Sequence, residues 1–153
     1  VQARVERGDV AGLAEPDGWQ ALGCHPDRPV AHLSLGNPHS VVGVDDVAVV
    51  DLAHLGAQVP HVNLEIVEPG PEPDAITMRV HERGAGITEA CGTGACASAY
   101  AARSWGLVNA GVDEVVVHMD GGTATVSFPD DTPQRAVLTG PATFVASVEV
   151  TLA

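Results

Sequence analysis

A cysteine stands directly before a run of small residues in the segment EACGTGACAS, residues 89–98. If a helix begins after Cys91, the unpaired N–H groups of its first turn and the positive end of its dipole lie beside the sulfur. Both effects favour the thiolate and predict a lowered pKa for this thiol. Gly92 and Gly94 also let a ligand carboxylate approach those N–H groups closely. Cys91 is therefore a candidate catalytic residue, although a small buried residue at a tight turn explains the spacing equally well.

The other two cysteines, Cys24 and Cys96, are weaker candidates. Cys96 follows Cys91 by five positions, so on a helix the two thiols point about 140° apart and suit neither a disulfide nor a shared metal ion. We interpret Cys96 as a core residue. Cys24 stands in an irregular stretch, and we interpret it as an incidental thiol, with a stray metal ligand as the alternative. Three cysteines without paired spacing do not indicate a secreted disulfide framework.

Two further segments place polar side chains beside turn-forming residues. The segment GNPH offers Asn37 as a two-way hydrogen bonder and His39 as an acid or base, but on its own it equally predicts a solvated turn. The segment HERGAG places Glu82 and Arg83 before a glycine loop. Arg83 can bind a carboxylate as a fork, and Glu82 can orient an imidazole or a thiol. A surface ion pair is the alternative interpretation of these two residues.

Several well-known site motifs are missing from the sequence. The segment GAGITE lacks the last glycine of a dinucleotide fingerprint, and no GxxxxGK[ST], GxSxG, HExxH or CxxC motif occurs. The seven histidines are scattered without the spacing of metal ligands. We therefore expect neither a cofactor nor a metal ion.

Strand-like alternation of apolar and polar residues accounts for most of the elements that must position these groups. In AITMRVHE, Glu82 continues a face formed by Ile76, Met78 and Val80, so its carboxylate points where burial is costly. The predicted strands are 30–36, 41–44, 62–67 and 75–82, a hairpin of VDEVVVHM and TATVSF around DGG, and further strands after Arg135.

Two helices are predicted among these strands. Asp45 and Asp46 are candidate caps for a short helix that Gly56 ends. Residues 92–107 carry small side chains on all sides, and a helix without a polar face is usually buried. The predicted fold class is α+β, with antiparallel strands wrapped around one central buried helix.

The length and composition of the chain limit the classes of function that it can have. The chain has 153 residues, of which 45% are hydrophobic and 18% charged, and we expect residues 1–153 to form one domain. Twenty acidic residues against seven basic ones give a formal charge of −13, which disfavours nucleic acid and anionic membrane surfaces as partners. No apolar run reaches the ~18 residues of a membrane span, and no leader is visible. We therefore expect a soluble, acidic, cytoplasmic protein.

Taken together, the segments SLGNPHSVVGVDD, HVNLEIV, HERGAGITEACGTGACA and LTGPA resemble the diaminopimelate epimerase family, in order and at family-like spacing. The resemblance covers most of residues 30–145. It implies an isomerase that works without pyridoxal phosphate. One cysteine thiolate removes the α-proton of diaminopimelate and a second cysteine thiol returns a proton on the opposite face. The LL and meso forms interconvert, which feeds lysine and peptidoglycan synthesis.

The resemblance also assigns roles to single residues. Cys91 matches the second family cysteine, and His39 and Glu82 match the residues that tune the thiols. The residues that match those holding the substrate are Asn37, Asn63, Glu82, Arg83, Gly92 and Thr93. These roles agree with the chemistry, because removing a weakly acidic α-proton requires a held carboxylate and a desolvated thiolate.

The chain departs from the family in one large respect. The family is built from two similar halves, and its first cysteine lies in the N-terminal half within a GNGxRC-like segment that is absent here. We therefore expect a C-terminal half alone, whose partners are diaminopimelate and the N-terminal half, with a homodimer also compatible. Residues 147–152 then lack their usual partner, and the isolated chain does not epimerise. The alternatives are a related racemase for another amino acid, such as proline, and a non-catalytic amino-acid-binding half-domain.

Overall fold

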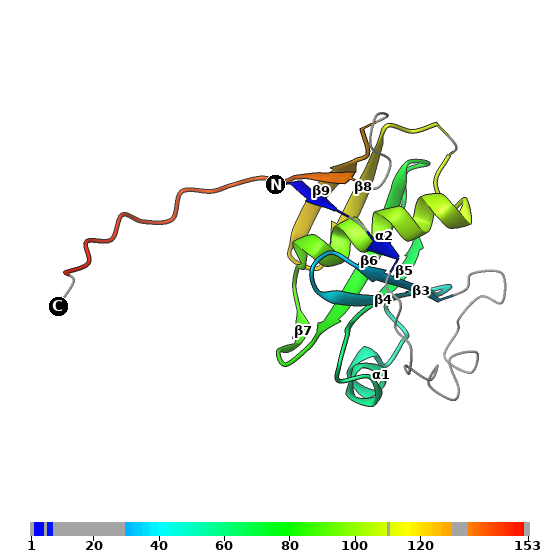
Figure 1. Cartoon of the computed structure of the whole chain (residues 1–153), viewed down its shortest axis with the longest axis horizontal. Helices are drawn as coiled ribbons and strands as arrows, with labels where there is room; N and C mark the ends of the chain where they lie inside the picture. Colours follow the sequence, from blue (N-terminus) through cyan, green and yellow to red (C-terminus); the bar gives the residue numbers. More distant parts are fainter. Residues whose placement is uncertain (1, 5, 8–29, 110, 130–134, 152–153) are drawn as a thin grey trace.

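The computed structural model describes residues 2–4, 6–7, 30–109, 111–129 and 135–151, so Cys24 lies outside the described residues. The described residues form ten strands and two helices (Figure 1). The strands are β1 (Gln2–Arg4), β2 (Glu6–Arg7), β3 (Ala31–Ser34), β4 (Pro38–Gly43), β5 (Asn63–Pro69), β6 (Ala75–Glu82), β7 (Gly86–Thr88), β8 (Glu114–Met119), β9 (Gly122–Ser127) and β10 (Arg135–Thr139). The helices are α1 (Leu52–Gln58) and α2 (Gly92–Trp105).

The strands form one curled sheet in the order β1-β10-β9-β8-β6-β5-β4-β3-β2, and β7 pairs with β6. The α+β class is confirmed, but the expectation of a purely antiparallel sheet is wrong. Strands β4 and β5 are parallel, and so are β6 and β8. Parallel neighbours need a long crossover connection. The first crossover contains α1, and the second contains β7 and α2, so the two helices account for the two parallel pairs.

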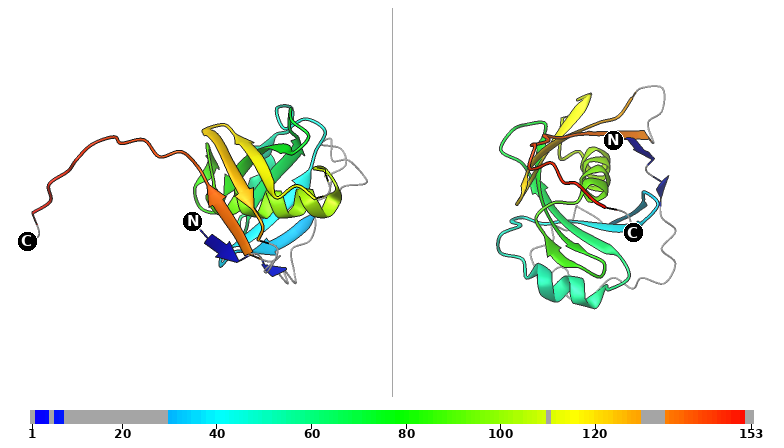
Figure 2. Two further views of the ribbon diagram at one scale, coloured as in Figure 1. Left: turned by 90° about the horizontal axis from the view of Figure 1, so that it is seen from above. Right: turned by 90° about the vertical axis from the view of Figure 1, so that its left-hand side faces the viewer.

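Helix α2 lies on the concave side of the curled sheet (Figure 2). It contacts β3, β4, β5, β6, β8, β9 and β10. Eight of its fourteen residues are buried, mostly alanines, because small side chains let strands approach the helix from several directions. Arg103 and Ser104, near its end, and Gly92, at its start, stay exposed. Gly106 ends the helix in the left-handed conformation, with φ 71°.

Helix α1 covers the opposite face of the sheet, where Leu52 and Leu55 pack in a second apolar cluster with Leu64 and Ile66 of β5. The predicted boundaries of this helix are wrong. Asp51 caps it instead of Asp45 or Asp46, because the Asp51 carboxylate accepts the His54 N–H at 3.1 Å. The helix also continues through Gly56 to Gln58.

Strand β5 is buried on both faces from Asn63 to Val67, including the polar residues Asn63 and Glu65. Alternation places Leu64 and Ile66 toward α1, and it places Asn63 and Glu65 on the same side as α2. Between β3 and β4, Gly36 adopts a positive φ of 86° and the chain bends at residues 35–37. Strand β4 therefore begins earlier than predicted, at Pro38, and His39 lies on a strand rather than in a turn.

After β10 the chain runs away from the sheet as an extended tail of residues 140–151 (Figures 1 and 2). Phe144, Val145, Val148 and Val150 are all at least 72% exposed. Of the strands predicted after Arg135, only β10 is present, and the prediction is wrong for residues 140–151, which form no strand. In the described part of the chain, neither helix is long and apolar enough to cross a bilayer.

Candidate active site

Cys91 is the N-cap residue of α2, as the spacing of EACGTGACAS predicts. Its backbone is extended, and its sulfur accepts the Gly94 N–H at 3.3 Å. The side chain is 7% exposed and faces a pocket. The β6–β7 hairpin brings the chain to this point, and the glycines of the first helical turn keep the sulfur free of larger neighbours.

Burial is the main influence on the Cys91 thiol and raises its pKa above the ordinary value, while Thr93 and the Gly94 N–H lower it. The net direction is opposite to the lowered pKa expected from the helix N-terminus. The reason is that removing the sulfur from water disfavours its charged form more than two hydrogen-bond donors favour it. Cys96 is a core residue, as predicted, and burial raises the pKa of its thiol to about 11.

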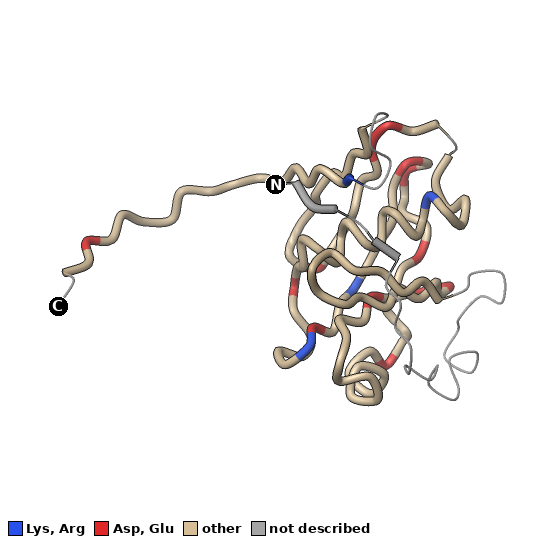
Figure 3. Tube along the Cα trace, viewed as in Figure 1, with Lys and Arg blue, Asp and Glu red and all other residues tan. Residues whose placement is uncertain are grey.

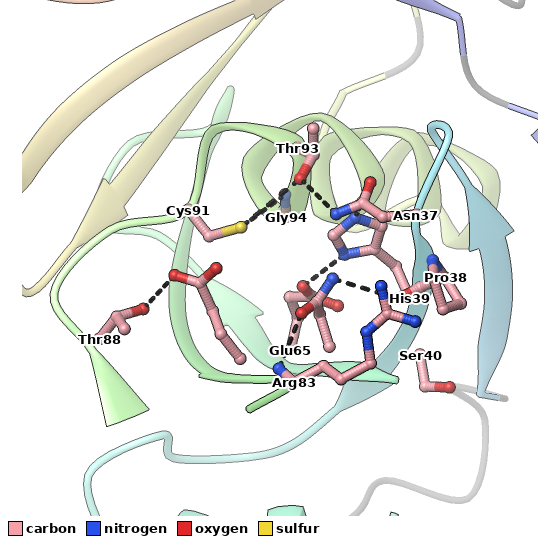
Figure 4. A network of polar contacts seen from close by, with 12 residues as sticks. Asn37, Pro38, His39, Ser40, Glu65, Arg83, Thr88, Cys91, Thr93 and Gly94 are labelled. Carbon is pink, nitrogen blue, oxygen red and sulfur yellow. Dashed lines mark hydrogen bonds and ion pairs between the residues drawn. The ribbon is translucent and has the colours of Figure 1, made fainter. Parts of the chain in front are cut away.

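A chain of polar contacts connects Cys91 to the interior of the sheet (Figure 4). His39 is fully buried, and its Nδ1 lies 2.7 Å from Oε1 of Glu65. Its Nε2 lies 3.1 Å from Oδ1 of Asn37, whose Nδ2 donates to Oγ1 of Thr93 at 3.2 Å. Thr93 Oγ1 in turn lies 3.6 Å from the Cys91 sulfur. The interpretation of GNPH as a solvated turn is therefore wrong, because Asn37 is half-buried and His39 is inaccessible.

Glu82 reaches the same pocket from the end of β6. Its face continues that of Ile76, Met78 and Val80, as the alternation predicts, and Glu82 is half-buried. Oε1 of Glu82 accepts the Thr88 hydroxyl at 2.6 Å, which orients the carboxylate, and Glu82 and Cys91 line the same pocket.

Asn63 and Arg83 organise the loop that follows β6. The Arg83 N–H donates to Oδ1 of Asn63 at 2.9 Å, and Nδ2 of Asn63 donates to the Pro38 carbonyl at 3.2 Å. The Arg83 side chain itself is exposed. Among the described residues, Arg83 and Glu82 do not form the surface ion pair that was the alternative interpretation.

Cys91 and Glu82 face a pocket of about 450 Å³. Its lining residues are Glu82, Ala90, Cys91, Gly92, Thr93, Cys96 and Leu138. The pocket thus combines a thiol, a carboxylate and the exposed N-terminal turn of α2, which is suited to an anionic group. This arrangement can hold a small acid and exchange a proton with it. Among the described residues, no three His, Cys, Asp or Glu side chains gather to hold a metal ion.

The sequence reasoning missed Glu65, which lies at the inner end of the chain of contacts. It is fully buried, and burial raises its pKa to about 7 although the contact with His39 lowers it. Its Oε2 has no hydrogen-bond partner within the described residues. Glu65 also fills the space above Gly94, where an added Cβ would lie 2.7 Å from Oε1. The available signal was a glutamate inside the apolar run VNLEIV, where a charge is unexpected.

The sequence of this chain is similar to those of known epimerases and racemases. The model of the diaminopimelate epimerase family matches residues 32–145. The diaminopimelate epimerase of Bacteroides thetaiotaomicron is 42% identical over 124 residues, covering 77% of this chain and 45% of that protein. The O-ureido-serine racemase of Streptomyces lavendulae is 41% identical over 122 residues, covering 75% of this chain and 41% of that protein. The chain therefore spans less than half the length of these relatives.

Solved structures show the same fold. A phenazine biosynthesis protein of the PhzF family from Bacillus anthracis aligns with a TM-score of 0.50 and 20% sequence identity. The alignment covers 63% of this chain and 32% of that chain. At this identity the likeness concerns the fold, a curled mixed sheet with helices, and not the chemistry.

Proposed function

Because this chain belongs to the diaminopimelate epimerase family, we propose that it supplies the second catalytic cysteine of a cofactor-independent amino-acid epimerase. The proposed reaction interconverts LL- and meso-diaminopimelate. The observation that carries this proposal is the position of Cys91, which caps α2 at the pocket and lies beside Glu82 and Thr93. We place the reaction in the cytoplasm, which accords with the free thiols of Cys91 and Cys96.

In the proposed mechanism, Cys91 exchanges one proton with the α-carbon. A base on the opposite face removes the α-proton, and the Cys91 S–H then protonates the carbanion and leaves a thiolate. In the reverse direction the Cys91 thiolate takes that proton. The raised pKa of Cys91 supports a protonated resting thiol. The Gly94 N–H and Thr93 support the thiolate once the proton has left.

Other residues hold the substrate in this proposal. The backbone N–H groups of Gly92 and Thr93 bind the α-carboxylate, because the first helical turn presents unpaired donors. Glu82 binds the α-amino group and tunes the thiol. Asn37, Asn63 and Arg83 hold the distal end of the substrate. Asn37 and Asn63 are fixed by hydrogen bonds to their neighbours, and the exposed Arg83 guanidinium is available for a second carboxylate.

The proposed partner is an N-terminal half that carries the other cysteine. The extended tail, residues 140–151, supports this partner because it exposes several large apolar side chains and only one charge, Glu149 (Figure 3). Such a segment requires a covering surface. We propose that it joins the sheet of the partner half, and that the two halves together enclose α2 at the centre of the molecule. Residues 1–153 form the C-terminal domain of this assembly, and a homodimer of the whole assembly is compatible with it.

The test is incorporation of solvent deuterium at the α-carbon of diaminopimelate. We expect none with the 153-residue chain alone, and exchange when the N-terminal half of a family member is added. Cys91→Ser then lowers exchange by at least about 100-fold, because a thiol acid–base group is lost. The matched control is Cys96→Ala, a core substitution under which exchange persists. Full turnover by the isolated chain would contradict the half-site proposal.

A second substrate is supported by one observation. The Streptomyces lavendulae racemase is as similar to this chain as the epimerases are. The alternative substrate is therefore O-ureido-serine, which has no second carboxylate at its distal end. Deuterium exchange on the two amino acids discriminates between them. Arg83→Gln should slow exchange on diaminopimelate and leave exchange on O-ureido-serine nearly unchanged.

A further inference from the structure

Glu65 and His39 form a buried pair that the proposed proton transfer leaves unexplained. Both side chains are fully buried, and Nδ1 and Oε1 lie 2.7 Å apart. The pair is connected to Cys91 through Asn37 and Thr93, and the contacting atoms along this path lie 3.1 to 3.6 Å apart. Oε2 of Glu65 has no hydrogen-bond partner among the described residues, and burying a carboxylate in this way is costly.

The direction of each hydrogen bond follows from counting protons. The Asn37 amide donates from Nδ2 to Thr93, so its Oδ1 faces His39 and must accept the proton of Nε2. The 2.7 Å contact between Nδ1 and Glu65 then requires one more proton between those two atoms. That proton sits on Nδ1 with Glu65 ionised, or on Oε1 with His39 neutral. In both cases Nε2 keeps its own proton, and the Thr93 hydroxyl hydrogen is free to donate to the Cys91 sulfur.

Loss of the shared proton reverses the direction of hydrogen-bond donation along this chain of contacts. An ionised Glu65 beside a neutral His39 must accept from Nδ1, which leaves Nε2 without a proton. The Asn37 amide then turns over to donate to Nε2, and its oxygen faces Thr93. The Thr93 hydroxyl now donates to Asn37 instead of the sulfur. Cys91 thereby loses one hydrogen-bond donor and gains a negative charge nearby.

We propose that Glu65 is a positioning residue that acts through His39, Asn37 and Thr93, and that the shared proton of the Glu65–His39 pair decides whether Thr93 donates to Cys91. This inference rests on the proposed function of Cys91 for its catalytic meaning. The ionisable groups that face Glu65 are His39 from β4, Glu82 from β6 and Cys91 at the start of α2. The pKa of Glu65 near 7 agrees with a shared proton that is released around neutral pH.

Glu65→Gln is the informative variant because it keeps the shape and removes the titration. In this variant the glutamine oxygen takes the place of Glu65 Oε2, and the glutamine NH₂ takes the place of Oε1. The NH₂ group then donates to Nδ1 of His39, so Nε2 of His39 keeps its proton at every pH. Nitrogen NMR of the His39 ring from about pH 5 to about pH 9 shows directly which of the two ring nitrogens carries a proton. At the upper pH we expect Nε2 to carry no proton in the unmodified chain and Nδ1 to carry no proton in the variant. Nδ1 bare at high pH in the unmodified chain overturns the proposal, even if the variant does not fold.

The effect on Cys91 is measured by alkylation of its thiol, followed by site-resolved mass spectrometry. Glu65→Gln should accelerate alkylation near pH 8 about three- to tenfold, since Thr93 keeps donating and no charge forms at position 65. In the background of Thr93→Val this gain should shrink at least about twofold. An undiminished gain means that Glu65 acts by charge alone and overturns the role of the chain of contacts.

Glu68→Gln on the same strand is the matched control, because Glu68 binds the Val47 N–H outside this chain of contacts. It should leave the His39 spectrum and the alkylation rate unchanged. Neither measurement uses a substrate. A failure of these outcomes therefore counts against Glu65, whereas absent deuterium exchange with normal outcomes here counts against the proposed reaction.

Discussion

Residue by residue, burial sets the chemistry of this site. The sulfur of Cys91 receives two hydrogen-bond donors at the start of α2, yet its pKa is raised because it is withdrawn from water. Glu65 is affected still more strongly, since it is fully buried beside His39. Both acids are therefore held in their protonated forms to a higher pH than in solution. For Cys91 this favours proton donation, and for Glu65 it allows a proton to be shared.

The raised pKa of Glu65 predicts a dependence of stability on pH. Between its unfolded value of about 4.5 and its folded value of about 7, the folded state binds the extra proton. The free energy of unfolding should thus fall as pH rises through this window, by at most about 3 kcal/mol for this group. Urea unfolding at several pH values measures the slope.

Glu65→Gln should flatten this slope, whereas Glu68→Gln should leave it in place. Glu68 is the appropriate comparison because it is only half-buried on the same strand. A slope that is equally steep in Glu65→Gln would show that another group releases the proton.

Among the elements, the close approach of α2 to β5 is the contact on which the site depends. The helix can begin beside Glu65 because residue 94 has no side chain. Its alanines continue this fit along the concave face of the sheet. The crossovers that contain α1 and α2 place β4 beside β5 and β6 beside β8 in parallel. These pairings bring His39, Glu65 and Glu82 to one end of the helix.

Gly94→Ala tests this approach. The new Cβ would lie 2.7 Å from Glu65 Oε1 and 3.2 Å from Cys91 Cβ, so the helix or the strand must shift. We expect a loss of about 1–3 kcal/mol in the free energy of unfolding. Calorimetry or urea unfolding provides the measurement. Gly140→Ala is the control, because its Cβ would meet only Ala124 at 3.9 Å, and its effect should stay within about 0.5 kcal/mol.

On the scale of the whole molecule, the proposed partner half concerns both the pocket and the tail. Cys91 and Gly92 from the start of α2 and Leu138 from β10 all line the pocket. The tail begins directly after β10, which lies close to this pocket through Leu138. A partner half that binds the tail is therefore also placed to cover the pocket.

Val148→Asp tests the role of the tail. The alternation of residues 144–150 places Phe144, Val148 and Val150 on one face and Ser147 and Glu149 on the other. We expect Val148→Asp to leave the unfolding of the isolated chain unchanged within about 0.5 kcal/mol, since the side chain is exposed there. It should weaken binding of the N-terminal half by at least about tenfold, because a charge is then buried. Calorimetric titration of the two halves gives this value.

Ser147→Asp adds the same charge on the other face and serves as the control. Equal weakening by both variants would show that the tail binds through its net charge rather than through an apolar face. Unaltered binding in Val148→Asp would remove the tail from the proposed interface.

The sequence by itself determined the local features of this protein. Small residues after Cys91 predict the start of α2, alternation predicts β6 and the β8–β9 hairpin, and Glu82 follows from the face it shares with Met78. These features depend on neighbours within a few positions, where periodicity and capping dominate. The boundaries of α1 and β4 were predicted less well, because Asp51 and Pro38 compete with equally suitable residues nearby.

Only the tertiary structure decided what the site contains. The parallel pairings, the burial of His39 and the burial of Glu65 depend on contacts between strands that are distant in sequence. The pKa of Cys91 shows the same limit. The hydrogen bonds at the start of the helix are local and lower this pKa, but burial depends on many surrounding residues and raises it by more. Desolvation depends on everything packed around a group, so no short stretch of sequence carries it.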